Sequence, residues 1–108
     1  MSKSSKKIIK NSLEDLKAQN TTFLDISKLN SFTDNLVITS GTSSRHMSAI
    51  KDRLIEDLKK NKISISGVEG QDSTDWILLD LGDYVVNIMS LDSRKLYDLE
   101  SLWDPSLN

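Results

Sequence analysis

The stretch "VITSGTSSRH", Val37 to His46, has the residue types of a phosphate-binding turn. A glycine-containing turn that leads into a helix directs backbone N–H groups and the positive end of the helix dipole toward an anion. Gly41 to Ser43 would form such a turn. The same residues also suit a plain connection between a strand and a helix, with Thr42 or Ser43 as the N-cap. The rest of the sequence must decide between these two interpretations.

Nucleotidyl transfer at such a turn requires two or three carboxylates on neighbouring strands, because the metal ions that neutralise a triphosphate need hard oxygen ligands. The segment after the expected helix, Ile63 to Ser66, contains no carboxylate. Asp80 and Asp83 lie three positions apart across a predicted hairpin turn, where carboxylates commonly bind turn amides. The sequence therefore predicts no metal site and no cofactor.

The remaining candidates for catalysis are also incomplete. His46 has no evident carboxylate to orient it as a general base. Ser43 and Ser44 lack the G-x-S-x-G pattern of an activated serine, and capping explains them better. "GVEG", Gly67 to Gly70, is too short and misplaced for a dinucleotide fingerprint and predicts the end of a strand or a bulge. We expect a protein that is not an enzyme.

Length and composition restrict the chain to one small domain. It has 108 residues, of which 37% are hydrophobic, enough for one core. With no cysteine and a single histidine, it can form neither a disulfide nor a zinc cluster of imidazoles and thiolates. No apolar run approaches the roughly 20 residues of a membrane span. We expect one cytoplasmic domain over residues 1–108, with flexible ends at 1–5 and 105–108 and no membrane partner.

Charge is divided unevenly along the chain. Residues 1–20 carry five lysines against Glu14 and Asp15, a net charge of +3, whereas residues 69–108 carry nine carboxylates against Arg94 and Lys95, a net charge of −7. The acidic half would repel a phosphate backbone and favour a basic protein partner. We expect no sequence-specific binding of nucleic acid. The N-terminal lysines are interpreted as a solvated helix start, with contact to RNA as the alternative.

Hydrophobic spacing predicts three helices and five strands. The helices are expected at Lys6–Gln19, with Ile9, Leu13 and Leu16 on one face, at Ser43–Lys60, with Met47, Ile50, Leu54 and Leu58, and from Asp92 or Ser93 to Trp103, with Leu96, Leu99 and Leu102. Asn61 is predicted as a left-handed residue after the second helix, and Pro105 marks the end of the third. The strands are expected at Thr22–Ile26, Asn35–Ser40, within Lys62–Gly67, Trp76–Asp80 and Tyr84–Met89.

These elements follow one another as α-β-β-α-β-β-β-α. The long helix allows a parallel crossover between the strands on either side of it, and the compact connection "LGD" predicts that the last two strands form an antiparallel hairpin. The fold class is therefore α/β, with a mixed sheet of about five strands flanked by helices.

Three segments together resemble a known family. "TDNLVITSGTSSRHMSAI", "GVEGQDSTDWILLDLGDYVVNIM" and "SRKLYDLESLWD", in that order and spacing, closely resemble the ribosomal silencing factor family, called RsfS or Iojap. The resemblance covers about residues 8–104. The family pattern falls on Thr33, Asp34, Gly41, Ser43, Arg45, Glu69, Gly70, Trp76, Leu79, Asp80, Gly82, Asp83, Arg94, Tyr97, Leu99, Glu100, Leu102 and Trp103.

The resemblance implies a domain similar in shape to nucleotidyltransferases but without their catalytic carboxylates. It implies binding to the large ribosomal subunit through ribosomal protein number fourteen, steric blocking of subunit association, and repression of translation in starvation or stationary phase. It also implies a homodimer for some members when free, and a role of organellar relatives in large-subunit assembly. The alternative function is a nucleotide-binding or nucleotidyl-transferring enzyme on a related fold.

The partner surface is expected around the last hairpin and last helix. Its predicted residues are Trp76, Leu79, Asp80, Asp83, Tyr84, Arg94 and Tyr97, with Arg45 as an additional contact. Aromatic anchors beside acidic groups suit a basic ribosomal protein. Two alternatives stay open: Trp76 is simply buried, and Arg94 pairs with a neighbouring carboxylate. The sequence departs from many members near Asn35 and Leu36, where an aromatic is common, at Leu81, where Tyr is common, and at Asn87, where His is common.

Overall fold

A computed structural model describes residues 2–29, 33–71, 73 and 75–103, with the backbone alone at 2–4 and 103. The predicted flexible end at 105–108, like Pro105 and Met1, lies outside these residues.

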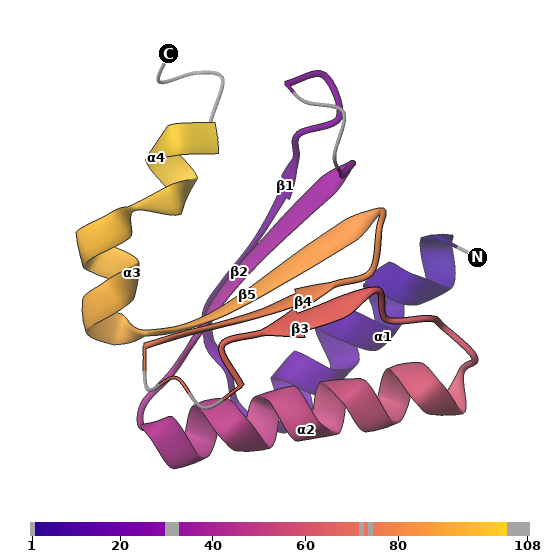
Figure 1. Ribbon diagram of the computed structural model, residues 1–108, viewed down its shortest axis with the longest axis horizontal. Helices are drawn as coiled ribbons and strands as arrows, with labels where there is room; N and C mark the ends of the chain where they lie inside the picture. The colour runs from indigo at the N-terminus through magenta and orange to yellow at the C-terminus, as the bar shows by residue number, and fades with distance from the viewer. Residues whose placement is uncertain (1, 30–32, 72, 74, 104–108) are drawn as a thin grey trace.

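The structure is a single sheet with helices on both of its faces (Figure 1). Its elements are α1 (Ser2–Asp15), β1 (Gln19–Asp25), β2 (Asn35–Gly41), α2 (Ser44–Lys60), β3 (Gly67–Glu69), β4 (Trp76–Asp80), β5 (Tyr84–Ser90), α3 (Leu91–Tyr97) and α4 (Leu99–Trp103).

The five strands lie in the order β1-β2-β5-β4-β3. The central pair, β2 and β5, is parallel, and each of the other pairs is antiparallel. The predicted mixed α/β sheet and the antiparallel hairpin of the last two strands are confirmed. The strands before and after α2 do run in the same direction, but β5 and β4 lie between them. The likeness to nucleotidyltransferases stays a prediction.

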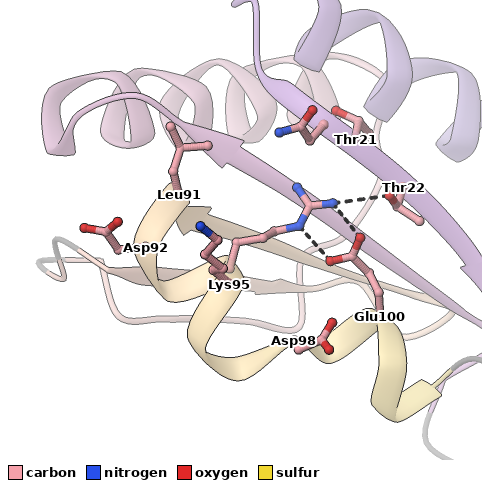
Figure 2. A pocket seen from close by; sticks show the side chains of 9 residues that line it. Thr21, Thr22, Leu91, Asp92, Lys95, Asp98 and Glu100 are labelled. Carbon is pink, nitrogen blue, oxygen red and sulfur yellow. Dashed lines mark hydrogen bonds and ion pairs between the residues drawn. The ribbon is translucent and has the colours of Figure 1, made fainter.

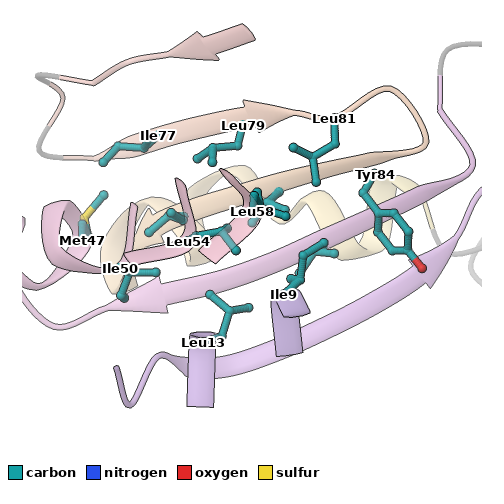
Figure 3. Packing of buried hydrophobic residues seen from close by; sticks show 13 residues of the cluster. Ile9, Leu13, Met47, Ile50, Leu54, Leu58, Ile77, Leu79, Leu81 and Tyr84 are labelled. Carbon is teal, nitrogen blue, oxygen red and sulfur yellow. The ribbon is translucent and has the colours of Figure 1, made fainter. Parts of the chain in front are cut away.

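The main core lies between the sheet and the pair α1 and α2 (Figure 3). Apolar side chains recur on α2 at spacings of three and four residues, and all of them are buried: Met47, Ile50, Leu54 and Leu58. This spacing puts one stripe of the helix against the sheet. Alternate residues of the strands, among them Ile77, Leu79, Val86 and Ile88, fill the other side of the same core.

A smaller core lies on the opposite face of the sheet, where α3 and α4 are placed (Figure 1). It consists of Ile26, Leu36, Ile38 and Met89, with Leu24, Trp76, Val85 and Leu99 packed around it. α3 and α4 are short, so they cover only part of this face. Of the predicted partner surface, Leu79 and Tyr84 belong to the main core and Trp76 packs against the smaller one.

Several element boundaries differ from the prediction. α1 spans Ser2–Asp15 and not Lys6–Gln19, because Lys17 adopts a left-handed conformation (φ 57°) and the amide of Ala18 returns to the carbonyl of Leu13 at 2.9 Å. After α2, the left-handed residue is Lys62 (φ 59°) and not Asn61. The third strand is Gly67–Glu69, since Ile63 to Ser66 form no strand ladder.

The last predicted helix is two helices. Asp98 between them has φ 45° and ψ 56°, the left-handed geometry that ends a helix, and its amide donates to the carbonyl of Arg94 at 3.1 Å. The chain turns there, so the predicted apolar stripe does not pack as one face. Leu96 is 76% exposed and Leu102 is 63% exposed, so these two residues of the predicted stripe do not enter the core. Leu99 packs against the smaller core.

Candidate functional site

Trp76 begins β4 and is half-buried on the face covered by α3 and α4. Its indole Nε1–H donates a 2.8 Å hydrogen bond to the side-chain Oδ1 of Asn87. Its ring lies 5.2 Å from the ring of Tyr97, at an interplanar angle of 42°. The side chain thus belongs partly to the core and partly to the surface. The sequence left open whether Trp76 is buried or lies on the surface. In the structure it does both in part.

Asn87 is a site residue that the sequence analysis did not identify. It lies on β5 with 1% exposure, and its Nδ2 donates to the carbonyl of Val37 at 3.3 Å. Its amide therefore connects three strands and orients the indole of Trp76. The signal in the sequence was a single polar residue at an inward position of an otherwise apolar strand, a position that requires a hydrogen-bond partner.

The exposed apolar side chains gather on the last two helices. Among the described residues, five large hydrophobic side chains are exposed, namely Leu29, Leu91, Leu96, Tyr97 and Leu102, and four of them belong to α3 and α4. Tyr97, at 53% exposure, is the member that also touches Trp76. Grouped exposed apolar residues of this kind commonly mark a protein-binding surface. We call Trp76, Leu96, Tyr97 and Leu102 the aromatic edge.

Arg94 is used inside the protein. Its Nε and Nη2 donate to the two carboxylate oxygens of Glu100 at 2.9 and 3.1 Å, and its side chain is only 11% exposed (Figure 2). Further bonds lead to the hydroxyls of Thr22 and Ser40, both at 3.2 Å. Of the two roles that the sequence left open, pairing with a carboxylate is the one that the structure shows. Its donors are engaged within the protein, and its role as a partner contact stays a prediction.

The predicted hairpin residues separate into two groups. Leu79 has 0% and Tyr84 has 6% exposure, and both point into the main core with the side chains that Figure 3 labels. Their prediction as surface contacts is wrong because alternate residues of β4 and β5 face α1 and α2. Asp80 and Asp83 are half-buried at the turn. The Oδ1 of Asp80 accepts the amide of Gly82 at 2.8 Å, as expected for a carboxylate in a turn.

Two titratable groups near this end of the sheet have shifted pKa values. Burial raises the pKa of the Tyr84 hydroxyl, and the carboxylates of Asp83 and Asp25 add to this effect. The pKa of Asp25 is lowered, first by the hydroxyl of Ser27, which donates at 2.7 Å, and then by the amide of Ser27 at 3.0 Å. The carboxylate of Asp25 thereby closes the turn that follows β1.

The turn at Gly41 is a connection with a capped helix. The hydroxyl of Ser43 accepts the amide of His46 at 3.1 Å, so Ser43 is the N-cap. The ring of His46 accepts the amide of Thr42 at Nδ1, 2.9 Å, and lies 2.7 Å through Nε2 from the carbonyl of Leu16. His46 thus ties the end of α1 to the start of α2. Arg45 beside it is exposed, and its role as an additional contact stays a prediction.

The described part of the chain contains no group of three or more His, Asp or Glu side chains arranged to hold a metal ion. A hollow of about 220 Å³ does lie beside Gly41, Ser43 and Ser90, between the ends of the parallel strands β2 and β5. The hydroxyls of Ser43 and Ser90 already cap α2 and α3. None of the helices among the described residues has the length and apolar character to cross a membrane.

The structure is that of a small α/β domain that exposes apolar and aromatic side chains on α3 and α4. The family model described as "Ribosomal silencing factor during starvation" matches residues 1–107. A ribosomal silencing factor RsfS of Haemophilus influenzae is 44% identical over 91 residues, which cover 84% of this chain and 89% of that protein. The chain belongs to the RsfS family of ribosomal silencing factors.

More distant relatives and solved structures agree with this assignment. The mouse protein "Mitochondrial assembly of ribosomal large subunit protein 1" is 39% identical over 75 residues, which are 67% of this chain and 33% of that protein. A crystal structure of a Chromobacterium violaceum protein superposes with a TM-score of 0.90 at 36% identity, over 94% of this chain and 84% of that one. A Bacillus halodurans structure gives 0.84 at 31% identity, over 94% of each chain.

Proposed function

We propose that this protein silences ribosomes by binding the large subunit through ribosomal protein number fourteen and blocking attachment of the small subunit. The observation that carries the proposal is the aromatic edge, in a chain that belongs to the ribosomal silencing factors. The name of the mouse relative, which refers to assembly of the large subunit, supports the choice of subunit. The mechanism is steric occupation of a surface and requires no turnover.

The chemistry of this surface favours a basic protein as its partner. Tyr97 and Trp76 supply rigid aromatic contact area, of the kind that contributes most to binding at interfaces. Asp98 on the α3–α4 turn is exposed and carries negative charge beside Tyr97. Ribosomal proteins are rich in Lys and Arg, so charge complementarity would accelerate association and orient the complex.

The function is tested by mixing the purified protein with large subunits, adding small subunits and following association by sucrose-gradient sedimentation. We expect the fraction of joined ribosomes to fall as protein is added. Undiminished association at an excess of protein that saturates the large subunit would contradict the proposal. Magnesium-dependent turnover of a nucleoside triphosphate above a buffer blank would favour the nucleotidyl-transferring alternative.

The surface is tested with Tyr97→Ala, because Tyr97 is exposed and its loss should leave the fold intact. We expect affinity for large subunits to fall by about tenfold or more, with an unchanged far-UV circular-dichroism spectrum. Leu29→Ala is the matched control, since Leu29 is an exposed apolar residue outside α3 and α4. Equal affinity of the Tyr97 and Leu29 variants would place the interface elsewhere.

A further inference from the structure

The side chain of Arg94 joins four elements of the fold. It starts on α3, bonds both carboxylate oxygens of Glu100 on α4 and reaches Thr22 on β1 (Figure 2). It also reaches the hydroxyl of Ser40 on β2. Paired N–H donors on two carboxylate oxygens form the strong bidentate geometry of arginine. The pair lines an open hollow of about 810 Å³, in which the side chain of Arg94 is 11% exposed and that of Glu100 is 37% exposed.

α4 needs such an attachment because it is short. It has five residues, and helices of this length are unstable by themselves in water. It is joined to α3 through Asp98, a non-glycine residue in a left-handed conformation. Leu99 packs against the smaller core, and Glu100 bonds Arg94 of α3, which in turn bonds Thr22 and Ser40 of the sheet. The direction of α4 therefore depends strongly on this pair.

We infer that Arg94 and Glu100 are positioning residues for the aromatic edge. Their bond fixes the turn at Asp98, so Tyr97 stays beside Trp76 and Leu102 is presented on the same helical pair. The consequence for binding rests on the proposed function, whereas the consequence for local order does not. A surface fixed in advance loses less conformational entropy on binding than one that must order itself.

The local part is tested by amide hydrogen exchange in Glu100→Gln, which keeps the size of the side chain and removes its charge. The reporters are the amides of Asp98 and Leu102, which donate to the carbonyls of Arg94 and Asp98. We expect them to exchange roughly tenfold faster or more. The amide of Val86 on the central strand β5 reports global unfolding, and we expect it to change by less than about twofold. Equal acceleration at Val86 and Leu102 would overturn the inference, because the pair would then support only global stability.

A double-mutant cycle tests whether the two side chains act as a pair. Once Arg94→Gln is present, adding Glu100→Gln should change the exchange of Leu102 by less than about twofold. If the two substitutions accelerate the exchange of Leu102 by factors that multiply in the double variant, the two side chains act independently. This result would contradict the inference. Glu56→Gln is the matched control, because it removes the exposed Lys60–Glu56 pair at 3.2 Å on α2, and it should leave the Leu102 amide unchanged.

The binding part is tested by the affinity of Glu100→Gln for large subunits, which we expect to fall at least threefold while Glu56→Gln binds as the wild type does. Wild-type affinity of the Glu100 variant, together with faster exchange at Leu102, would overturn the link between this pair and binding. Failure of the wild-type protein to bind large subunits would instead overturn the proposed function and leave the exchange result standing.

Discussion

At the scale of single residues, the indole of Trp76 depends on one buried acceptor. Asn87 is 1% exposed and serves both the indole N–H and the carbonyl of Val37. A buried polar group that loses its partner bears the full cost of desolvation. The amide of Asn87 therefore supports the orientation of the aromatic edge as well as the stability of the sheet.

Asn87→Ala should lower the free energy of unfolding by about 1 to 3 kcal/mol, since Trp76 Nε1 and the Val37 carbonyl lose their partner. The measurement is urea denaturation followed by circular dichroism. Asn11→Ala is the control, because Asn11 is exposed on α1, and its effect should stay within about 0.5 kcal/mol. Equal effects of the two variants would show that the buried amide does not stabilise the fold.

Tyr84 makes the stability depend on pH in the alkaline range. Its pKa in the native state lies above the ordinary value of 10.0, so between these two values the unfolded chain loses the phenolic proton while the native state keeps it. The contribution is fully present below pH 10 and decreases as pH rises through the raised pKa. Tyr84→Phe lacks this ionisation. The wild type should lose stability relative to the variant as the pH rises above 10.0, measured by urea denaturation. A constant difference over this range would refute the assignment.

The sequence predicted the types of the site residues better than their exposure. Leu79 and Tyr84 were placed on the partner surface, although strand alternation puts them in the core. Trp76 and Tyr97 were named separately, and the structure brings their rings together. The carboxylate that pairs with Arg94 could not be identified, because the bond depends on the turn at Asp98, and that residue carries no glycine signal.

At the scale of elements, the junction of β2 and α2 explains the glycine of the "VITSGTSSRH" stretch. A Cβ atom on Gly41 would lie 2.7 Å from Cγ of Met47 and 3.0 Å from its backbone nitrogen. Met47 is fully buried in the first turn of α2. The close approach of α2 therefore explains why this position is glycine. The explanation does not require a phosphate bound at the turn.

Gly41→Ala should destabilise the protein by about 1 to 3 kcal/mol, because the added methyl group overpacks the contact with Met47. Gly67→Ala is a matched control on β3, where an added Cβ would meet nothing within 4 Å. We expect it to change stability by less than about 0.5 kcal/mol. The measurement is thermal unfolding of both variants. Unchanged stability of the Gly41 variant would show that α2 can shift away from the strand.

Elements with strong periodicity were predictable, and those that depend on tertiary contacts were not. The stripe of α2 and the pattern of β4 gave both elements correctly, because burial follows directly from spacing. The last helix was predicted as one piece because Leu96, Leu99 and Leu102 recur every three residues. Its break at Asp98 is accompanied by the Arg94–Glu100 bond, which joins residues six positions apart.

At the scale of the whole molecule, the sheet separates two different surfaces. α1 and α2 cover one face, and α3 and α4, with the aromatic edge, lie on the other (Figure 1). Lysines of α1 such as Lys7 and Lys10 are exposed on the first side. The acidic second half of the sequence supplies α3 and α4. Residues 91–103 themselves carry three carboxylates against Arg94 and Lys95, a net charge of −1, beside the apolar side chains of the aromatic edge.

Binding to large subunits should weaken with ionic strength if this charge guides association. Raising salt from about 50 to about 200 mM, at constant magnesium, should slow association several-fold and change dissociation less. Stopped-flow or surface plasmon resonance measures both rates. Asp80→Lys should reduce the association rate further at low salt. An association rate that does not respond to salt would mean that charge has no guiding role.

The sheet order was the part of the global fold that the sequence did not predict. Local patterns identify strands, but β5 lies between β2 and β4, and no local pattern indicates such an insertion. The correct class followed because helices and strands alternate along the chain. The parallel partners β2 and β5 were separated by too many residues for spacing to connect them.

That insertion has a consequence for how the protein is made. Residues 35–41 pair directly with residues 84–90, so the centre of the sheet cannot close until residue 90 has left the ribosome. Before that point, β1, β2 and α2 can form only local structure with exposed apolar surface. Closure of the sheet should therefore wait until β5 has emerged, and until then the nascent chain should lack an assembled aromatic edge.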